Sequence, residues 1–62
     1  MLEFKDSTNK AKEMHSDNFG YVGDIILHRN GVYGLSASTI LYKCTSDELR
    51  QIADKLDELN GK

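Results

Sequence analysis

The strongest structural signal in the chain is a capped, amphipathic stretch at residues 45–60. Thr45 and Glu48 have the spacing of a capping box, in which each side chain accepts a hydrogen bond from the backbone amide of the other residue. Gly61 stands where helices commonly end in the left-handed conformation. Between these signals, apolar residues recur at helical spacing: Leu49, Ile52, Ala53, Leu56 and Leu59. The stretch predicts an α-helix over residues 46–60 with one apolar face.

The dipeptide Asn30-Gly31 predicts a tight hairpin turn. A two-residue type I′ turn needs positive φ at both central positions, and asparagine and glycine tolerate it best. The flanking stretches, 21–28 and 32–36, are β-prone and are expected to pair as antiparallel strands. After a short interruption by small residues, a third β-prone stretch covers 39–44. We predict an α+β fold, in which a small antiparallel three-stranded meander is covered on one face by the C-terminal helix.

The N-terminal third has a weaker pattern. Leu2 and Phe4 alternate with charged residues, which favours a short strand. Residues 10–15 contain helix formers but few apolar residues, so a short helix and a turn region both stay open. The expected core consists of Ile25, Leu27, Leu41, Leu49, Ile52, Ala53, Leu56 and Leu59, with Phe4 or Phe19 closing an edge. Because the run Ile25-Ile26-Leu27 gives apolar side chains to both faces of a strand, the pattern does not fix which face stays open.

Size limits how such a chain can be stabilised. Its 62 residues allow a single domain over 1–62, and a core of that size rarely stabilises a fold by more than ~3–5 kcal/mol without a staple. The only cysteine, Cys44, excludes an internal disulfide. His15, His28 and Cys44 lack the paired spacing of a structural zinc site, so we expect no metal or other cofactor. Self-association is the staple that remains, and we predict a homo-oligomer, a dimer or higher.

Charge and hydropathy disfavour two classes of partner. The net charge is −2 and lysines alternate with carboxylates, whereas nucleic-acid binders usually carry a basic face. No apolar run approaches the ~18 residues of a membrane span, and the start does not resemble a secretory signal. A single unpaired cysteine is typical of a reducing compartment. We therefore expect a cytoplasmic protein, of a cell or of an infected host cell.

The sequence contains no catalytic constellation. His15 and His28 lack a recognisable nucleophile motif and an orienting partner, so we expect a protein that is not an enzyme. Cys44 precedes the predicted helix, where a helix dipole can lower a thiol pKa. The same position suits a small buried apolar group, which is the interpretation we favour.

The candidate binding residues lie in the predicted sheet region. Tyrosine is enriched at interfaces and in base-stacking platforms, although a tyrosine on a strand can equally complete a core. Hydroxyl-rich loops can expose backbone amides to an anion, and two cations occur in the same region. The predicted binding residues are Tyr21, Arg29, Tyr33, Ser36, Ser38, Thr39, Tyr42 and Lys43.

Two functional hypotheses follow from these features. The first is a protein-interaction or inhibitor module that acts as a homo-oligomer on a larger protein, in the style of phage or mobile-element accessory factors. The alternative is a protein that binds or sequesters a small anionic ligand, a nucleotide or cyclic nucleotide, at an oligomer interface.

Overall fold

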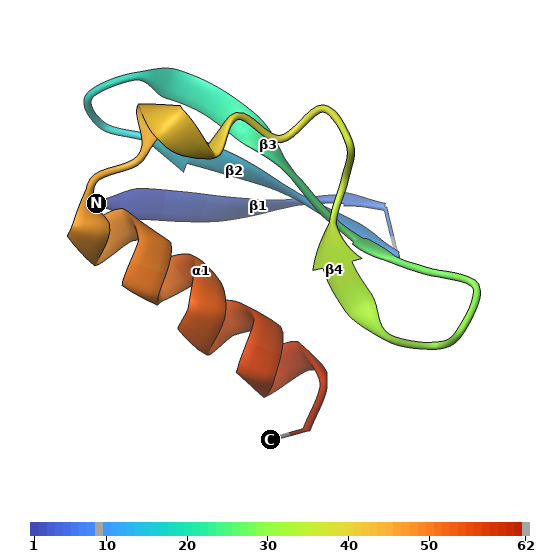
Figure 1. Ribbon diagram of the computed structural model, residues 1–62. Helices are drawn as coiled ribbons and strands as arrows, with labels where there is room; N and C mark the ends of the chain where they lie inside the picture. Colours follow the sequence, from blue (N-terminus) through green and yellow to red (C-terminus); the bar gives the residue numbers. More distant parts are fainter. Residues whose placement is uncertain (9, 62) are drawn as a thin grey trace.

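The computed structural model describes residues 1–8 and 10–61, which form one antiparallel sheet and one α-helix (Figure 1). The strands follow chain order across the sheet, β1-β2-β3-β4, and each pairs antiparallel with the next. The elements are β1 (Leu2–Thr8), β2 (Ala11–Ser16), β3 (Gly20–Leu27), β4 (Tyr33–Leu35), the 3₁₀ helix η1 (Leu41–Lys43) and α1 (Ser46–Leu59). The α+β class, the antiparallel sheet and the C-terminal helix are confirmed. Of the three predicted strands only the first two are present, as β3 and β4, and the sheet is completed by β1 and β2 from the N-terminal residues.

The N-terminal residues form a hairpin, β1–β2. The expected strand at Leu2 and Phe4 is present, whereas residues 10–15 lie mainly in β2 and the helical alternative is wrong. Met14 and Ser16 are buried on the covered face, while the alternating Glu13 and His15 are only half-buried. Burial therefore alternates from residue to residue along the strand. Because one of the buried residues is a serine, the sequence does not show this as an alternation of apolar and polar residues.

The predicted third strand at 39–44 is absent. Residues 36–40 instead run along the edge of β3 with isolated hydrogen bonds, from the Ser36 amide to the Asp24 carbonyl and from the Ile40 amide to the Val22 carbonyl. The Thr39 hydroxyl lies within hydrogen-bond distance of both the amide and the carbonyl of Asp24, 3.3 Å from each. These side-chain bonds replace a regular ladder, and the chain then turns into η1.

The turn after β3 differs from the predicted type I′ turn. Gly31 has a φ of +82°, but no described residue other than glycine has a positive φ, so Asn30 does not adopt the conformation that type I′ requires. The Gly31 amide donates to the His28 carbonyl, and the His28 amide donates to the Val32 carbonyl. The connection is a three-residue loop that ends in a left-handed glycine, and the predicted hairpin is retained.

The core lies between the sheet and α1. Among the described residues, the buried apolar side chains are Leu2, Met14, Val22, Ile25 and Ile52. The irregular register opposite Met14 gives β3 one extra residue, and the strand buries both Val22 and Gly23 there.

The predicted core is correct for only some of its residues. Ile25 and Ile52 are buried, while Leu56, Leu59 and Phe4 pack partly buried against the core and Leu27 is half-buried. Three predicted core residues are exposed. Leu49 and Ala53 lie on a part of α1 beside the sheet rather than over it, and Leu41 belongs to the predicted 39–44 strand, which is absent. Phe19 is also exposed, so Phe4 is the phenylalanine that closes the core.

The helix α1 is formed as predicted and touches both edges of the sheet. Both capping-box bonds are present, from the Glu48 amide to the Thr45 hydroxyl and from the Thr45 amide to the Glu48 carboxylate. At the β1 edge, the Leu2 amide donates to Oε1 of Gln51 at 2.8 Å. At the β4 edge, Asn60 accepts from the Tyr33 amide at 2.8 Å and donates to the Tyr33 carbonyl at 3.1 Å.

Candidate interaction surfaces

Four of the eight predicted binding residues come together beside β3. The Ser36 hydroxyl lies 3.1 Å from the hydroxyls of both Ser38 and Thr39, and Thr39 bonds the backbone of Asp24. The Tyr21 hydroxyl donates to the Asp24 carboxylate at 2.7 Å. The bend at 36–39 brings these hydroxyls to the edge of the strand that carries the tyrosine.

A carboxylate dominates the electrostatics of this hydroxyl cluster. The hydrogen bond to Asp24 raises the pKa of Tyr21, because ionisation of the phenol would place two negative charges side by side. The same carboxylate repels phosphate, and the hydroxyls bond one another and the backbone. The cluster therefore suits a hydrogen-bond donor or a cation better than an anion.

The other four predicted residues lie elsewhere. Arg29 is exposed in the β3–β4 turn, away from the hydroxyl cluster. Tyr33 is half-buried on β4 and tied to α1 through Asn60. Tyr42 and Lys43 belong to η1. The eight residues therefore do not form a single site, because the predicted 39–44 strand that would have aligned them is absent.

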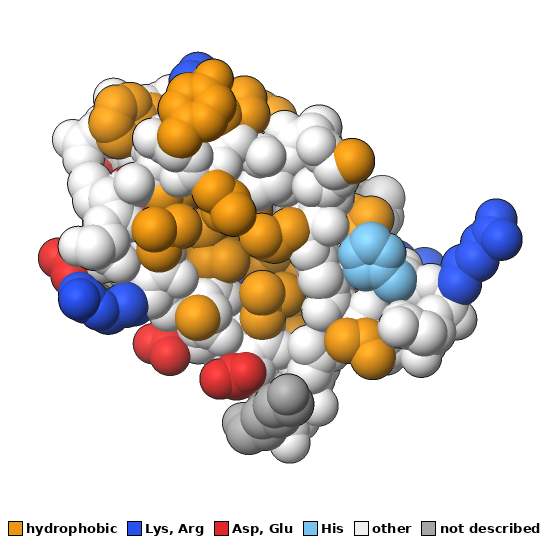
Figure 2. Space-filling view, viewed as in Figure 1, with side chains coloured by type: hydrophobic (Ala, Val, Ile, Leu, Met, Phe, Trp, Pro, Cys, Tyr) orange, Lys and Arg blue, Asp and Glu red, His pale blue; other side chains and the backbone are white. Residues whose placement is uncertain are grey.

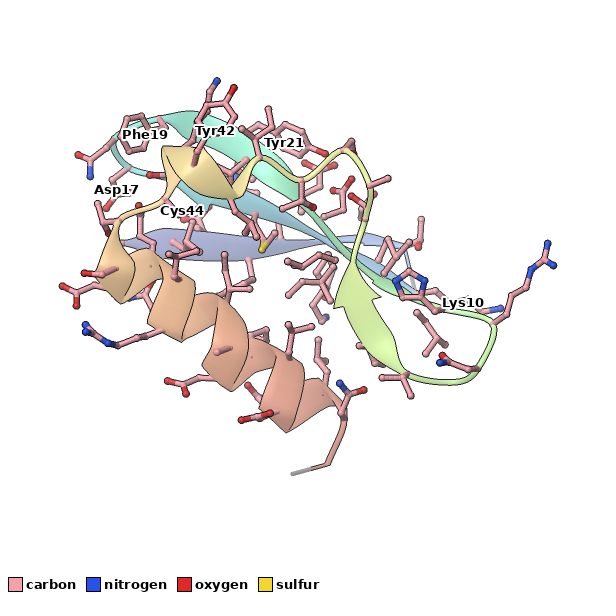
Figure 3. All side chains as sticks on the ribbon, viewed as in Figure 1. Lys10, Asp17, Phe19, Tyr21, Tyr42 and Cys44 are labelled. Atoms are coloured by element: carbon pink, nitrogen blue, oxygen red, sulfur yellow. The ribbon has the colours of Figure 1, made fainter. Side chains whose placement is uncertain are left out.

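Three aromatic side chains are exposed along one edge of the molecule, near the β2–β3 turn and η1 (Figure 3). Tyr42 is 87% exposed, Phe19 51% and Tyr21 44%, and we call these three residues the aromatic edge. The ring of Tyr21 also meets His15 edge to face at 5.6 Å between centroids. The two tyrosines were predicted binding residues, whereas Phe19 was expected in the core. Its position between turn-forming residues, in Asp17-Asn18-Phe19-Gly20, is the signal that could have placed it outside.

A second apolar surface lies between α1 and β4 (Figure 2). We call it the apolar patch: Tyr33, Leu35, Cys44 and Leu56 pack there against the core, and Leu49 and Ala53 continue the apolar stripe of α1. Most are half-buried, while Leu49 is 40% exposed and Ala53 is exposed. Burial raises the pKa of the Cys44 thiol, and the nearby Glu48 carboxylate adds to the effect. The cysteine is therefore a partly buried, weakly acidic thiol, which matches the interpretation favoured from sequence.

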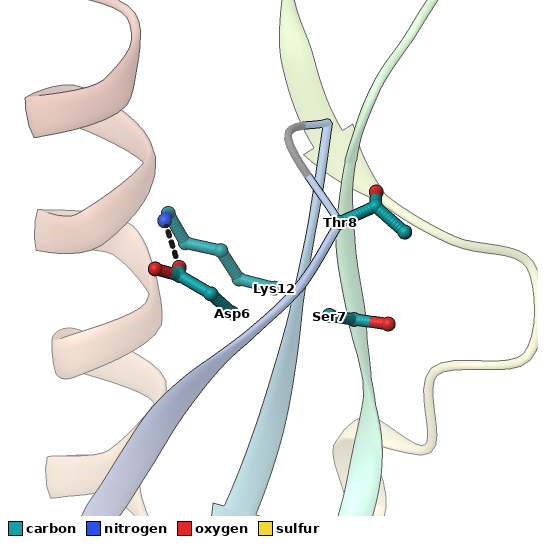
Figure 4. A pocket seen from close by; sticks show the side chains of 4 residues that line it. All are labelled: Asp6, Ser7, Thr8 and Lys12. Atoms are coloured by element: carbon teal, nitrogen blue, oxygen red, sulfur yellow. Dashed lines mark hydrogen bonds and ion pairs between the residues drawn. The ribbon is translucent and has the colours of Figure 1, made fainter.

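A polar pocket of about 400 Å³ lies at the end of the β1–β2 hairpin (Figure 4). Asp6 and Lys12 form an ion pair on one side of β1, while the side chains of Ser7 and Thr8 point to the other side. The ion pair lowers the pKa of Asp6 and raises that of Lys12. Because these two charges neutralise each other and the hydroxyls do not converge on them, the described lining residues do not make an ion-binding site.

Glu48 is a buried carboxylate, 1% exposed, that links three parts of the chain. It accepts from the Ser16 hydroxyl at 2.7 Å and from the Thr45 amide at 3.0 Å, and the Met1 ammonium lies 3.5 Å away. Ser16 in turn accepts from the amides of Asn18 and Phe19. Through these bonds Glu48 fixes the β2–β3 turn as well as the start of α1.

Acid is expected to weaken the fold through Glu48. The Ser16 hydroxyl, and next the Thr45 amide, hold the pKa of this carboxyl below its usual value. The unfolded chain therefore takes up the proton first, so the contribution is complete above about pH 4.3 and is lost as the pH falls through the lower folded-state pKa. Thermal unfolding followed across this range should show a midpoint that falls with acid.

The variant Glu48→Gln isolates this effect. Its midpoint should lie several degrees below that of the natural chain near neutral pH, and the difference should shrink as the pH falls. Asp6→Asn is the control, because Asp6 also has a lowered pKa but belongs to an exposed ion pair of small energy. An equal effect of both variants would contradict the central role of Glu48.

Other classes of site are not seen in residues 1–8 and 10–61. Within these ranges, no group of three or more His, Cys, Asp or Glu side chains is arranged to hold a metal ion. No helix there is both long enough and apolar enough to cross a membrane. In comparisons with known proteins, no family matches the chain, and no curated protein or solved structure shows significant similarity to it.

Proposed function

We propose that this protein is a protein-interaction module that acts as a homo-oligomer and binds a larger protein through the aromatic edge. The observation that carries the proposal is the exposure of Tyr42, Phe19 and Tyr21 on one side of a small domain. Aromatic residues are enriched in the cores of interfaces, and tyrosine is among the commonest binding hot spots. An exposed aromatic group of this kind marks a place where a partner removes apolar surface from water.

Two residues of the aromatic edge, Phe19 and Tyr21, are held in place before any partner arrives. Ser16 bonds the backbone amide of Phe19 at 3.3 Å, and Glu48 in turn fixes the Ser16 hydroxyl. The side chain of Tyr21 is held by a hydrogen bond from its hydroxyl to Asp24 and by an edge-to-face contact with the ring of His15. Because less conformational freedom is lost on binding, such a surface binds more tightly than a flexible one of equal area.

The double variant Phe19→Ser/Tyr42→Ser tests the aromatic edge. Both side chains are more than half exposed, so the variant should fold with an unfolding midpoint close to that of the natural chain. Loss of two hot-spot residues at about 2 kcal/mol each should weaken partner binding by a factor on the order of several hundred. Quantitative cross-linking in the cells that naturally contain the protein, followed by mass spectrometry of the adducts, measures this loss.

Val32→Ser is the matched control, because Val32 is 48% exposed but lies in the β3–β4 turn, away from the aromatic edge. The proposal predicts one defined protein adduct for the natural chain and for Val32→Ser, strongly reduced for the double variant. The same adducts in equal yield from all three proteins would overturn it.

A second candidate function is suggested by the hydroxyl cluster. Tyr21, Ser36, Ser38 and Thr39 meet around Asp24, as a site for a small ligand would require. The carboxylate favours a neutral or cationic ligand over the nucleotide considered from sequence. Native mass spectrometry of gently purified protein separates the two functions, since a ligand adds a small non-covalent mass and a protein partner adds a large one.

A further inference from the structure

We infer that Asn30 is a site of spontaneous deamidation in the folded chain, whereas Asn60 is protected by its hydrogen bonds to β4. The sequence contains two Asn-Gly dipeptides, Asn30-Gly31 and Asn60-Gly61. In both, the glycine has no side chain to obstruct the attack of its own amide nitrogen on the preceding asparagine side chain. The two dipeptides are chemically alike, so the fold decides which one reacts.

The reaction is an intramolecular substitution followed by hydrolysis. The Gly31 amide nitrogen gives up its proton and bonds to Cγ of Asn30. The bond from Cγ to Nδ2 breaks, and Nδ2 takes up a proton and leaves as ammonia. Water then opens the resulting succinimide at either carbonyl, which gives aspartate or isoaspartate. Water is the only other reactant, nothing is oxidised or reduced, and the product carries one more negative charge than asparagine.

The surroundings of Asn30 favour this reaction. Asn30 and Gly31 are both exposed in the β3–β4 turn, which projects beyond the sheet (Figure 1). The Val32 amide donates to Oδ1 of Asn30 at 3.1 Å. A donor at this oxygen stabilises the negative charge that develops on it as the nitrogen attacks. The side chain therefore has an activated carbonyl and a leaving nitrogen that faces water.

The side chain of Asn60 is held in the opposite way. Asn60 directly follows α1 and is half-buried. Its Oδ1 accepts from the Tyr33 amide at 2.8 Å, and its Nδ2 donates to the Tyr33 carbonyl at 3.1 Å. Nδ2 cannot leave, and Cγ cannot turn towards the Gly61 nitrogen, until these bonds are broken. Reaction at Asn60 therefore requires a local opening that separates the end of α1 from β4.

The backbone does not distinguish the two dipeptides. The Gly31 amide donates to the His28 carbonyl at 3.0 Å, and the Gly61 amide donates to the Glu58 carbonyl at 3.3 Å. Both glycines have a positive φ, +82° and +76°. Because the attacking nitrogen is bonded similarly in the two places, the side-chain bonds to Tyr33 are the difference on which the selectivity rests.

Reaction at Asn30 leaves the contact between α1 and β4 intact. An aspartate at position 30 still accepts from the Val32 amide, and its charge lies in an exposed turn. An aspartate at position 60 could accept from the Tyr33 amide but could not donate to the Tyr33 carbonyl, so two acceptor oxygens would meet. The fold thus tolerates the modification at the place where it occurs.

Peptide mass spectrometry of the purified chain, aged in mildly alkaline buffer below its unfolding midpoint, tests the inference. Digestion in acid stops the reaction and separates the two dipeptides, and replacement of NH₂ by OH raises the mass of a reacted peptide. Asn30 should react at least about tenfold faster than Asn60, because Asn60 must first give up two hydrogen bonds of ordinary net strength. In concentrated urea, where both dipeptides are unfolded, the two rates should become similar.

Matched variants test the two environments without the ageing reaction. The midpoint of thermal unfolding of Asn30→Asp should lie close to that of the natural chain, and that of Asn60→Asp several degrees lower. Gly31→Ala should slow the reaction at Asn30 several-fold, because a methyl group then obstructs the attacking nitrogen.

Three outcomes would overturn the inference. The first is equal rates at Asn30 and Asn60 in the folded chain. The second is a folded chain in which neither dipeptide reacts although both react in urea, since the β3–β4 turn would then protect Asn30. The third is an equal loss of stability in Asn30→Asp and Asn60→Asp, which would remove the protective role of the bonds to Tyr33.

Discussion

Replacement of Gly23 by alanine is expected to cost about 2–4 kcal/mol, a large part of the stability of a domain this small. A Cβ at this position would lie 2.5 Å from the Thr39 Cα, so backbone would have to move rather than a flexible side chain. The residue also has a φ of +149°, which alanine adopts only with strain. Thermal unfolding by circular dichroism should show a much lower midpoint, or an unfolded chain.

Gly31→Ala provides the matched comparison for this prediction. Gly31 also has a positive φ, +82°, but nothing lies within 4 Å of its added Cβ. Its substitution should cost only the backbone strain, about 1 kcal/mol. If both variants lost the same stability, the close approach of residues 36–40 to β3 would not be important for the fold.

The second large effect is expected from Ile25→Ala, which should cost about 2–5 kcal/mol. Ile25 is fully buried under α1, at 0% exposure, so truncation leaves a cavity in the core. The neighbouring Ile26 is only half-buried and pairs with Ala11 and Gly34, two positions without large side chains. Its truncation should cost about 1 kcal/mol or less, in proportion to the smaller area it removes from water.

This pair of variants tests the register of β3 as well as the size of the effect. Adjacent residues of a strand face opposite sides of the sheet, and a slip of one residue would exchange them. Chemical denaturation of the two variants under the same conditions gives both free energies of unfolding. A larger loss for Ile26→Ala than for Ile25→Ala would show that the faces are reversed.

The parts of the fold that could be predicted from sequence are those with local causes. The capping box needs only Thr45 and Glu48, three positions apart, and the turn after β3 needs only the preference of Gly31 for positive φ. Both were correct in position. The type of that turn was wrong, because the choice between type I′ and a longer loop depends on how the two strands are paired.

The parts that could not be predicted depend on distant contacts. Ser16 is a buried strand residue because Glu48, 32 positions later, supplies its hydrogen bond. Residues 39–44 are β-prone but leave the sheet because Thr39 is bonded to the backbone of Asp24 and packs against a glycine. Tertiary contacts of this kind override local strand propensity.

The candidate surfaces follow the same division. The enrichment of tyrosine at interfaces depends only on residue type, so Tyr21 and Tyr42 could be predicted as binding residues from the sequence. Their meeting with Phe19 depends on η1, which no pattern indicated. The apolar patch was hidden for a related reason, since Leu49 and Ala53 have the spacing of core residues and only the angle of α1 on the sheet leaves them exposed.

The side-chain amides of Gln51 and Asn60 hydrogen-bond backbone groups at the two edges of the sheet, where a further strand could pair. This arrangement also affects aggregation. An unpaired strand edge is a template on which other chains can add and grow into fibrils. Here Gln51 of α1 occupies the Leu2 amide at the β1 edge, and Asn60, directly after the helix, occupies both backbone groups of Tyr33 at the β4 edge. Detachment of α1 would open both templates at once, so solubility and helix docking are coupled in this chain.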